Sequence, residues 1–316
     1  MFDKVIVNNG QVRPFLRFLI SVVGIMTLAT TVGFIVVKMP NIKPWDHRIS
    51  LLFWSNLLML PSFLALYLVL TRLLEQRPLG SVGLAFRGRW KHELAIGLVA
   101  GGGMIVAVAG LERLLGVAKF SLSQSPPERI VLTGGFLFVL LAVAAVDEEL
   151  VFRGYPFQRL VDSGGPLVAV AALSVLFGVA HLGNPFHTWI STANTILVGV
   201  LLAVCYLRTR ALWLPIGIHF AWNYFQGYVL GFPVSGLAFP RPILAASVHG
   251  PVWLTGGAYG PEGSILTLGI ILAGTVYFFL TRRIYITPEM RELACGPRSG
   301  ENREVSIAPR SVVPTE

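Results

Sequence analysis

The hydrophobic positions of this chain fall into eight long runs that short polar segments separate. A helix needs about 20 mostly apolar residues to cross the hydrocarbon core of a bilayer. We therefore predict an all-α, polytopic membrane protein with about eight transmembrane helices. The predicted spans are residues 15–37, 50–73, 94–111, 130–152, 166–182, 188–207, 211–230 and 264–281.

The third span carries two small residues, Gly97 and Gly101, on one face of the predicted helix. Glycines four residues apart allow the backbone of another membrane helix to approach closely. We expect a second helix to pack tightly against this face.

The runs leave no gap that is long enough for a second domain, so residues 1–284 are predicted to form one transmembrane domain. Residues 285–316 are rich in Pro, Gly, Ser, Arg and Glu and show no apolar periodicity. This composition predicts a disordered cytoplasmic tail. Residues 231–263, which we call the cap segment, are too long for a tight turn and are expected to lie outside the membrane, with no chemistry assigned to them.

Composition supports the membrane prediction, because 54% of the residues are hydrophobic and only 13% are charged, against about 25% charged in soluble domains. The formal net charge is +9, but the basic residues are spread between the apolar runs. Such charges orient loops and meet lipid head groups, so nucleic acid is not an expected partner. The distribution of lysine and arginine between the loops predicts that both termini lie in the cytoplasm. The short loops and the lack of a recognisable cleavable signal favour a bacterial cytoplasmic membrane.

The first group of candidate functional residues follows the apolar run at 136–146 and comprises Asp147, Glu148, Glu149 and Arg153. Glu149 and Arg153 are four residues apart and can pair on one helix face. Glu148 points elsewhere, and an unpaired, partly desolvated carboxylate suits a general base. Asp147 by itself is better interpreted as a marker of the membrane boundary.

Two histidines lie within predicted membrane helices, where ionisable side chains indicate a functional site. His181 ends the fifth span, and His219 and Asn223 share one face of the seventh. Glu148 and His181 can hold and deprotonate a water, and His219 and Asn223 can donate hydrogen bonds to the oxyanion that forms when this water attacks a carbonyl. This set predicts amide hydrolysis within the bilayer.

A zinc site is the competing interpretation of the same residues. His181, His219 and Glu148 would give a His2Glu ligand set with one position open for water. The sequence contains no His-Glu-x-x-His motif, which is the strongest zinc-protease signature. At this point the site is predicted to need either no cofactor or Zn²⁺.

Three short motifs occur in a fixed order on the predicted helices. They are Glu148-Glu149-x-x-x-Arg153, Phe177-x-x-x-His181 and His219-x-x-x-Asn223. Together they resemble the CAAX protease and bacteriocin-processing (CPBP, or Abi) family over roughly residues 130–225. The resemblance implies an intramembrane endopeptidase, of the glutamate or metallo type, whose partners are membrane lipid and a peptide or protein substrate near the membrane.

The resemblance also assigns roles to individual residues. Glu148 would be the water-activating base and His181 its partner, while His219 and Asn223 would form the oxyanion site. Glu149 and Arg153 would support this geometry. Some family members remove the last three residues of prenylated CAAX proteins and others serve peptide processing, bacteriocin immunity or scaffolding, so a silent scaffold or immunity protein is the alternative. A proton-coupled transporter would also bury such residues, but the chain shows no inverted repeat.

Glu148 and His181 reach a similar depth only if the fourth helix extends beyond its apolar run. We expect it to continue to Leu160, with a turn at 162–166, because Glu148 and His181 are then about equally far from the turn at 1.5 Å per residue.

Overall fold

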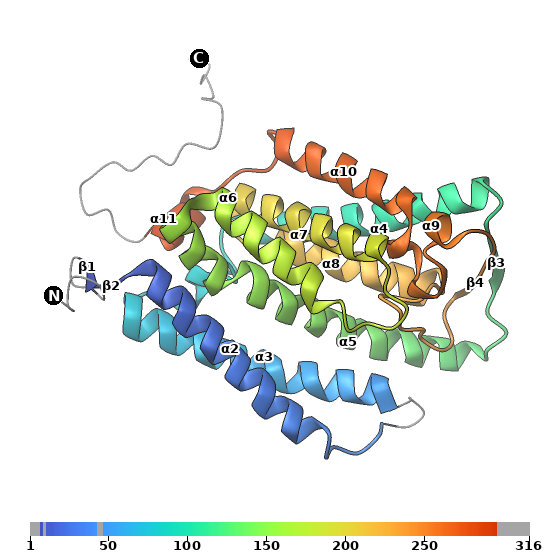
Figure 1. The fold of residues 1–316 in the computed structure, drawn as a ribbon, viewed down its shortest axis with the longest axis horizontal. Coiled ribbons are helices and arrows are strands. Elements are labelled where there is room, and N and C mark those ends of the chain that lie inside the picture. Colours follow the sequence, from blue (N-terminus) through green and yellow to red (C-terminus); the bar gives the residue numbers. More distant parts are fainter. Residues whose placement is uncertain (1–6, 9–10, 43–46, 296–316) are drawn as a thin grey trace.

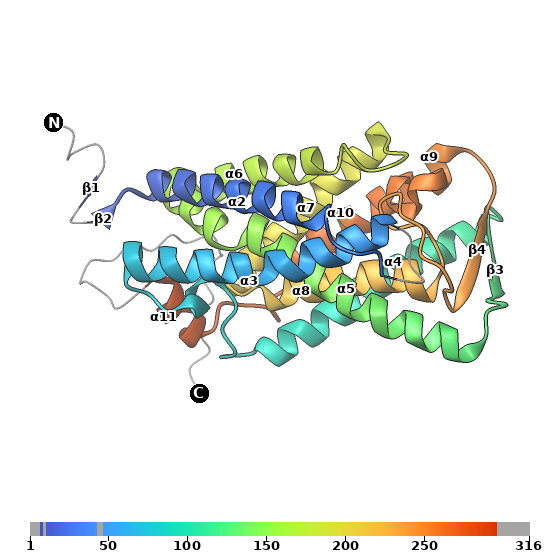
Figure 2. The ribbon, with the colours of Figure 1, turned by 90° about the horizontal axis from the view of Figure 1, so that it is seen from below.

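The computed structural model describes residues 7–8, 11–42 and 47–295. These residues are mostly helical, as predicted, and Figures 1 and 2 show the long helices lying side by side in one bundle. The principal helices are α2 (Pro14–Val36), α3 (His47–Glu75), α4 (Trp90–Leu114), α5 (Pro127–Arg153), α6 (Tyr155–Ala180), α7 (Trp189–Thr209), α8 (Trp213–Tyr224) and α10 (Ile265–Leu280).

Five helical stretches among the described residues are long and apolar enough to cross a membrane. Four of them are α2, α3, α4 and α7, and the fifth joins α5 and α6 over residues 127–180. Helix α8 has 12 residues and continues into the π-helical turn η2 (Phe225–Val229), and α10 has 16 residues. The all-helical membrane class is therefore supported, but the predicted count of about eight spans is not confirmed.

Two small antiparallel sheets lie outside the bundle, although the sequence predicted only helices. Strand β1 (Val7–Asn8) pairs with β2 (Gln11–Val12), and β3 (Ala118–Leu122) pairs with β4 (Leu244–Val248). The second sheet ties the loop after α4 to the cap segment. In both ribbon views β3 and β4 lie at one end of the bundle, and β2 and α11 (Pro288–Cys295) lie at the other.

Helices α4 and α8 pack closely at the centre of the bundle, which confirms the prediction from the glycine pair. A Cβ atom on Gly97 would lie 2.9 Å from the Cα of Gly217, and one on Gly101 would lie 2.8 Å from the Cα of Ile218. Neither distance leaves room for a methyl group, because carbon atoms in ordinary contact are about 3.5–4.0 Å apart. The glycines thus fix the position of α8, which carries His219 and Asn223.

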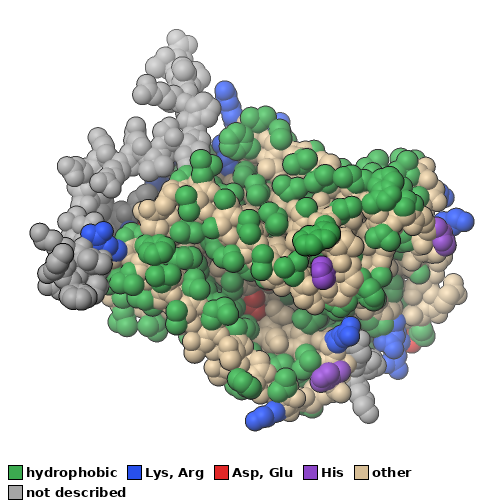
Figure 3. Space-filling view, viewed as in Figure 1, with side chains coloured by type: hydrophobic (Ala, Val, Ile, Leu, Met, Phe, Trp, Pro, Cys, Tyr) green, Lys and Arg blue, Asp and Glu red, His purple; other side chains and the backbone are tan. Residues whose placement is uncertain are grey.

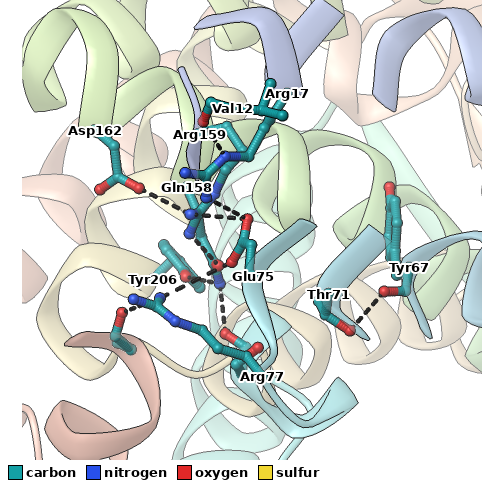
Figure 4. Close-up of polar contacts among 12 residues, drawn as sticks. Val12, Arg17, Tyr67, Thr71, Glu75, Arg77, Gln158, Arg159, Asp162 and Tyr206 are labelled. Carbon is teal, nitrogen blue, oxygen red and sulfur yellow. Dashed lines mark hydrogen bonds and ion pairs between the residues drawn. The ribbon is translucent and has the colours of Figure 1, made fainter. Parts of the chain in front are cut away.

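A buried ion network joins α2, α3 and α6 at the end of the bundle near β2 (Figure 4). Glu75 of α3 lies 3.1 Å from Arg17 of α2 and 3.0 Å from Arg159 of α6. The Glu75 side chain is only 2% exposed, and a buried carboxylate needs such partners because its desolvation costs several kcal/mol. Basic residues that the sequence suggested as loop charges therefore also hold three helices together.

The expected extension of the fourth helix to Leu160 is wrong in one respect. Helix α5 ends at Arg153, and Gly154, with φ −77° and ψ −134°, separates it from α6. A second break occurs at Gly165, where φ is 83° and ψ is 167°. A positive φ of this size is favoured by glycine, and it lies within the predicted turn at 162–166. The chain reverses at this break, and Figure 1 shows α5 and the later part of α6 lying alongside one another.

The predicted tail begins with an ordered segment. Residues 288–295 form helix α11, and Met290 is buried against Ala85 and Ala211. The remainder of the predicted tail, residues 296–316, lies outside the described residues.

Candidate active site

Three helices bring the predicted catalytic side chains to one cavity of about 370 Å³. Glu148 comes from α5, His181 directly follows α6, and His219 and Asn223 come from α8. All four line this cavity, most of whose other lining residues are hydrophobic. The space-filling view shows a largely hydrophobic face with an acidic group at the bottom of a hollow (Figure 3).

Glu148 lies beside both histidines, at ion-pair rather than hydrogen-bond distance. Its Oε2 atom is 3.9 Å from Nε2 of His181 and 3.7 Å from Nε2 of His219. The same oxygen is buried and has no hydrogen-bond partner among the described residues. Both separations are too long for a direct hydrogen bond, so Oε2 of Glu148 and the two Nε2 atoms remain available to bond to a water in the cavity.

The ring of His181 is oriented by its own helix. Its Nδ1 atom lies 2.7 Å from the carbonyl oxygen of Phe177, one helical turn earlier. Because a carbonyl oxygen only accepts hydrogen bonds, Nδ1 carries the proton. The Nε2 atom is then on the side of the ring near Glu148, and when it is unprotonated its lone pair can accept a hydrogen bond from a water.

Glu149 and Arg153 form the ion pair that their spacing predicts, with Nη1 of Arg153 3.1 Å from Oε1 of Glu149. The same carboxylate oxygen lies 2.9 Å from Nδ1 of His219, a contact that spans 70 positions of the sequence. Arg153 also donates to the carbonyl of Gly199 at 3.1 Å and stacks 4.5 Å above the ring of Phe177. Glu149 thus orients His219, and Arg153 compensates the buried charge of Glu149.

Asn223 lies one helical turn beyond His219 and lines the same cavity. Its amide and the Nε2 atom of His219 can donate hydrogen bonds into the cavity when that nitrogen is protonated. Two donors beside a carboxylate that can activate water are the groups that acyl hydrolysis requires.

The zinc interpretation does not fit the arrangement of these residues. In the part of the chain that the structure describes, no three His, Cys, Asp or Glu side chains are grouped so that they could hold a metal ion. We therefore derive no step through a metal.

Residues of the cap segment also line this cavity, although the sequence predicted no chemistry there. They include Ser235 and Glu262, and Asn194 of α7 lies beside them. One signal in the sequence could have identified Glu262, because it is the single acidic residue between Asp162 and Glu289. An isolated acid in a long apolar region needs a structural or functional reason.

Comparison with known protein families agrees with the motifs. A family described as type II CAAX prenyl endopeptidase Rce1-like matches residues 131–225. The match covers Glu148, His181, His219 and Asn223 and confirms the resemblance that the motifs predicted. No curated protein and no solved structure matches the chain.

Proposed function

We propose, from the Rce1-like match of residues 131–225, that this protein is an intramembrane endopeptidase that hydrolyses a peptide bond with a water held by Glu148 and His181. The observation that carries this proposal is the position of one buried Glu148 oxygen, within 4 Å of the Nε2 atoms of both His181 and His219. The surrounding cavity has a volume of about 370 Å³ and is lined mostly by hydrophobic residues.

The first chemical step is proton transfer from the bound water to Glu148. The hydroxide attacks the carbonyl carbon of the peptide bond, and the carbonyl oxygen becomes an oxyanion. In a cavity that excludes most water, hydrogen-bond donors aimed at this oxygen lower the barrier, and removing one typically costs about 10²–10³-fold in rate.

His219 and Asn223 would supply these donors. The Glu149 carboxylate accepts from Nδ1 of His219 at 2.9 Å, so it balances the charge of a doubly protonated ring, the form that also donates from Nε2. The proton held by Glu148 then passes to the nitrogen of the leaving group, and the carbon–nitrogen bond breaks. The products are a new carboxylic acid and an amine, which exchange one proton to become a carboxylate and an ammonium group, and Glu148 is again ionised.

The membrane arrangement is part of the proposal. We assign spans to α2, α3, α4, α5, α6, α7, α8 extended by η2, and α10, which together give the eight predicted crossings. The ends of the described chain, at β1 and α11, lie at the same end of the bundle (Figure 2), which is compatible with two cytoplasmic termini. Lipid and a peptide segment near the membrane are then the partners, and a bacterial membrane remains a prediction.

The proposal is tested by comparing cells that carry wild-type protein with cells that carry Glu148→Ala. Peptides or protein termini that accumulate uncut only in the variant are the expected result. A matched control is Glu289→Gln, which removes an exposed carboxylate on α11 and should leave the peptide profile unchanged. An identical profile in wild-type and Glu148→Ala cells, with both proteins present in the membrane, would contradict the proposal.

A further inference from the structure

The cap segment places a second carboxylate in the cavity that holds Glu148. Glu262, in the short helix η4 (Pro261–Gly263), lines this cavity together with Ser235. Its Oε2 atom accepts hydrogen bonds from the backbone nitrogen of Ser235 at 2.6 Å and from its hydroxyl at 2.9 Å. The Glu262 side chain is therefore held in one position.

Asn194 of α7 adds a fixed acceptor to the same part of the cavity. Its Nδ2 atom donates to the backbone carbonyls of Glu262 and Ser264, both at 2.8 Å. These two carbonyls determine which end of the amide is the nitrogen, because they can only accept. The Oδ1 atom has no hydrogen-bond partner among the described residues, although Asn194 is only 2% exposed. A buried acceptor without a donor is unfavourable, and a ligand that donates a hydrogen bond to it would remove this penalty.

The cavity contains no fixed cation to balance Glu262. No lysine or arginine of the described chain lines it, and its titratable groups are Glu148, Glu262, His181 and His219. Burial raises the pKa of Glu262 above its ordinary value, and the hydrogen bonds from Ser235, followed by the neighbouring His181, oppose this shift. A cationic group that entered the cavity would act in the same direction as His181 and would favour the ionised carboxylate.

We propose that Glu262 and Asn194 form a specificity subsite that binds the side chain of a lysine or arginine in the peptide substrate. An ammonium or guanidinium group supplies a positive charge to balance the Glu262 carboxylate, and it also supplies a hydrogen-bond donor for the Oδ1 atom of Asn194. A peptide carboxylate at this position would instead meet Glu262 with like charge. This subsite deepens the proposed protease function and rests on it, because the same cavity must admit the peptide.

Binding can be measured separately from cleavage with purified Glu148→Gln protein in lipid vesicles. The probes are fluorescent peptides with an apolar anchor, in which lysine, norleucine or glutamate is placed at each position in turn. At one position we expect lysine to bind roughly tenfold to a hundredfold more tightly than norleucine, as for a buried charged hydrogen bond, and glutamate to bind more weakly than norleucine.

The preference for lysine should disappear when Glu262→Gln is added to Glu148→Gln, because glutamine can still accept from Ser235 but carries no charge. Adding Glu289→Gln instead should preserve the preference. Equal binding of the lysine and norleucine peptides at every position would overturn the proposal of a subsite. This comparison uses protein with Glu262 intact, so it holds even if Glu262→Gln destabilises the cap segment. A lysine preference that survives Glu262→Gln would also overturn it. Failure of the proposed function has a different signature, in which wild-type protein binds the lysine peptide but cleaves none of the set.

Discussion

Replacing Gly101 by alanine should displace helix α8, which carries the proposed oxyanion residues His219 and Asn223. A Cβ atom at this position would lie 2.8 Å from both the Cα and the carbonyl carbon of Ile218, and it would meet the Ile218 carbonyl oxygen more closely still. Because carbon atoms in contact are about 3.5–4.0 Å apart, α8 must move by roughly 1 Å. Ile218 precedes His219 in the sequence, so the displacement reaches the site directly.

The expected effects are a loss of activity and a smaller loss of stability. A misplacement of about 1 Å can reduce the rate of a positioned reaction by about 10²-fold. Overpacking costs about 1–3 kcal/mol, and the better helix propensity of alanine returns up to about 1 kcal/mol. Cleavage of a peptide in vesicles gives kcat, and thermal unfolding in detergent gives the change in stability.

Gly103→Ala is the matched control, because it makes the same substitution on the same helix at an exposed site where a Cβ atom meets nothing within 4 Å. It should keep wild-type kcat and unfold at the same or a slightly higher temperature. If Gly101→Ala behaved like Gly103→Ala in both assays, the close contact between α4 and α8 would not position His219, and this reasoning would be refuted.

Three further predictions concern the site itself. Arg153→Ala leaves the buried Glu149 carboxylate without its 3.1 Å partner, so unfolding should become easier by about 3–5 kcal/mol; a change in unfolding free energy below about 1 kcal/mol would show that the pair is not needed for stability. Asn223→Ala should lower kcat by about 10²–10³-fold with little change in KM, and a change confined to KM would assign Asn223 to substrate binding instead. Treatment with a metal chelator should leave cleavage by purified protein unchanged, because no metal-binding group of three side chains occurs in the described part of the chain; loss of activity that zinc restores would contradict the glutamate mechanism.

The parts of the site that depend on local spacing could be predicted from the sequence. Glu149 and Arg153 pair because four residues make one helical turn. Gly97 and Gly101 approach α8 because small residues at the same spacing expose the backbone. The family motifs named the residues that line the cavity without giving any distance between them.

Features that depend on contacts between segments far apart in the sequence could not be predicted from local spacing. The bond from His219 to Glu149 and the entry of Glu262 into the cavity depend on how α5, α8 and the cap segment pack. Asp147, interpreted as a membrane-boundary residue, is buried, and its position at the end of an apolar run did not predict this. The break at Gly154 lies within an otherwise continuous helical pattern, so apolar periodicity gives no sign of it.

The most direct test of the central claim is a single-turnover cleavage assay with purified protein in vesicles made up in ¹⁸O-labelled water. For wild-type protein we expect one labelled oxygen in the new carboxylate. Glu148→Gln keeps the shape of the side chain but cannot take up the proton. For this variant we expect the cleavage rate to fall by about 10²–10⁴-fold, as for loss of a general base. Cleavage by Glu148→Gln at the wild-type rate would contradict the assignment of Glu148 as the base.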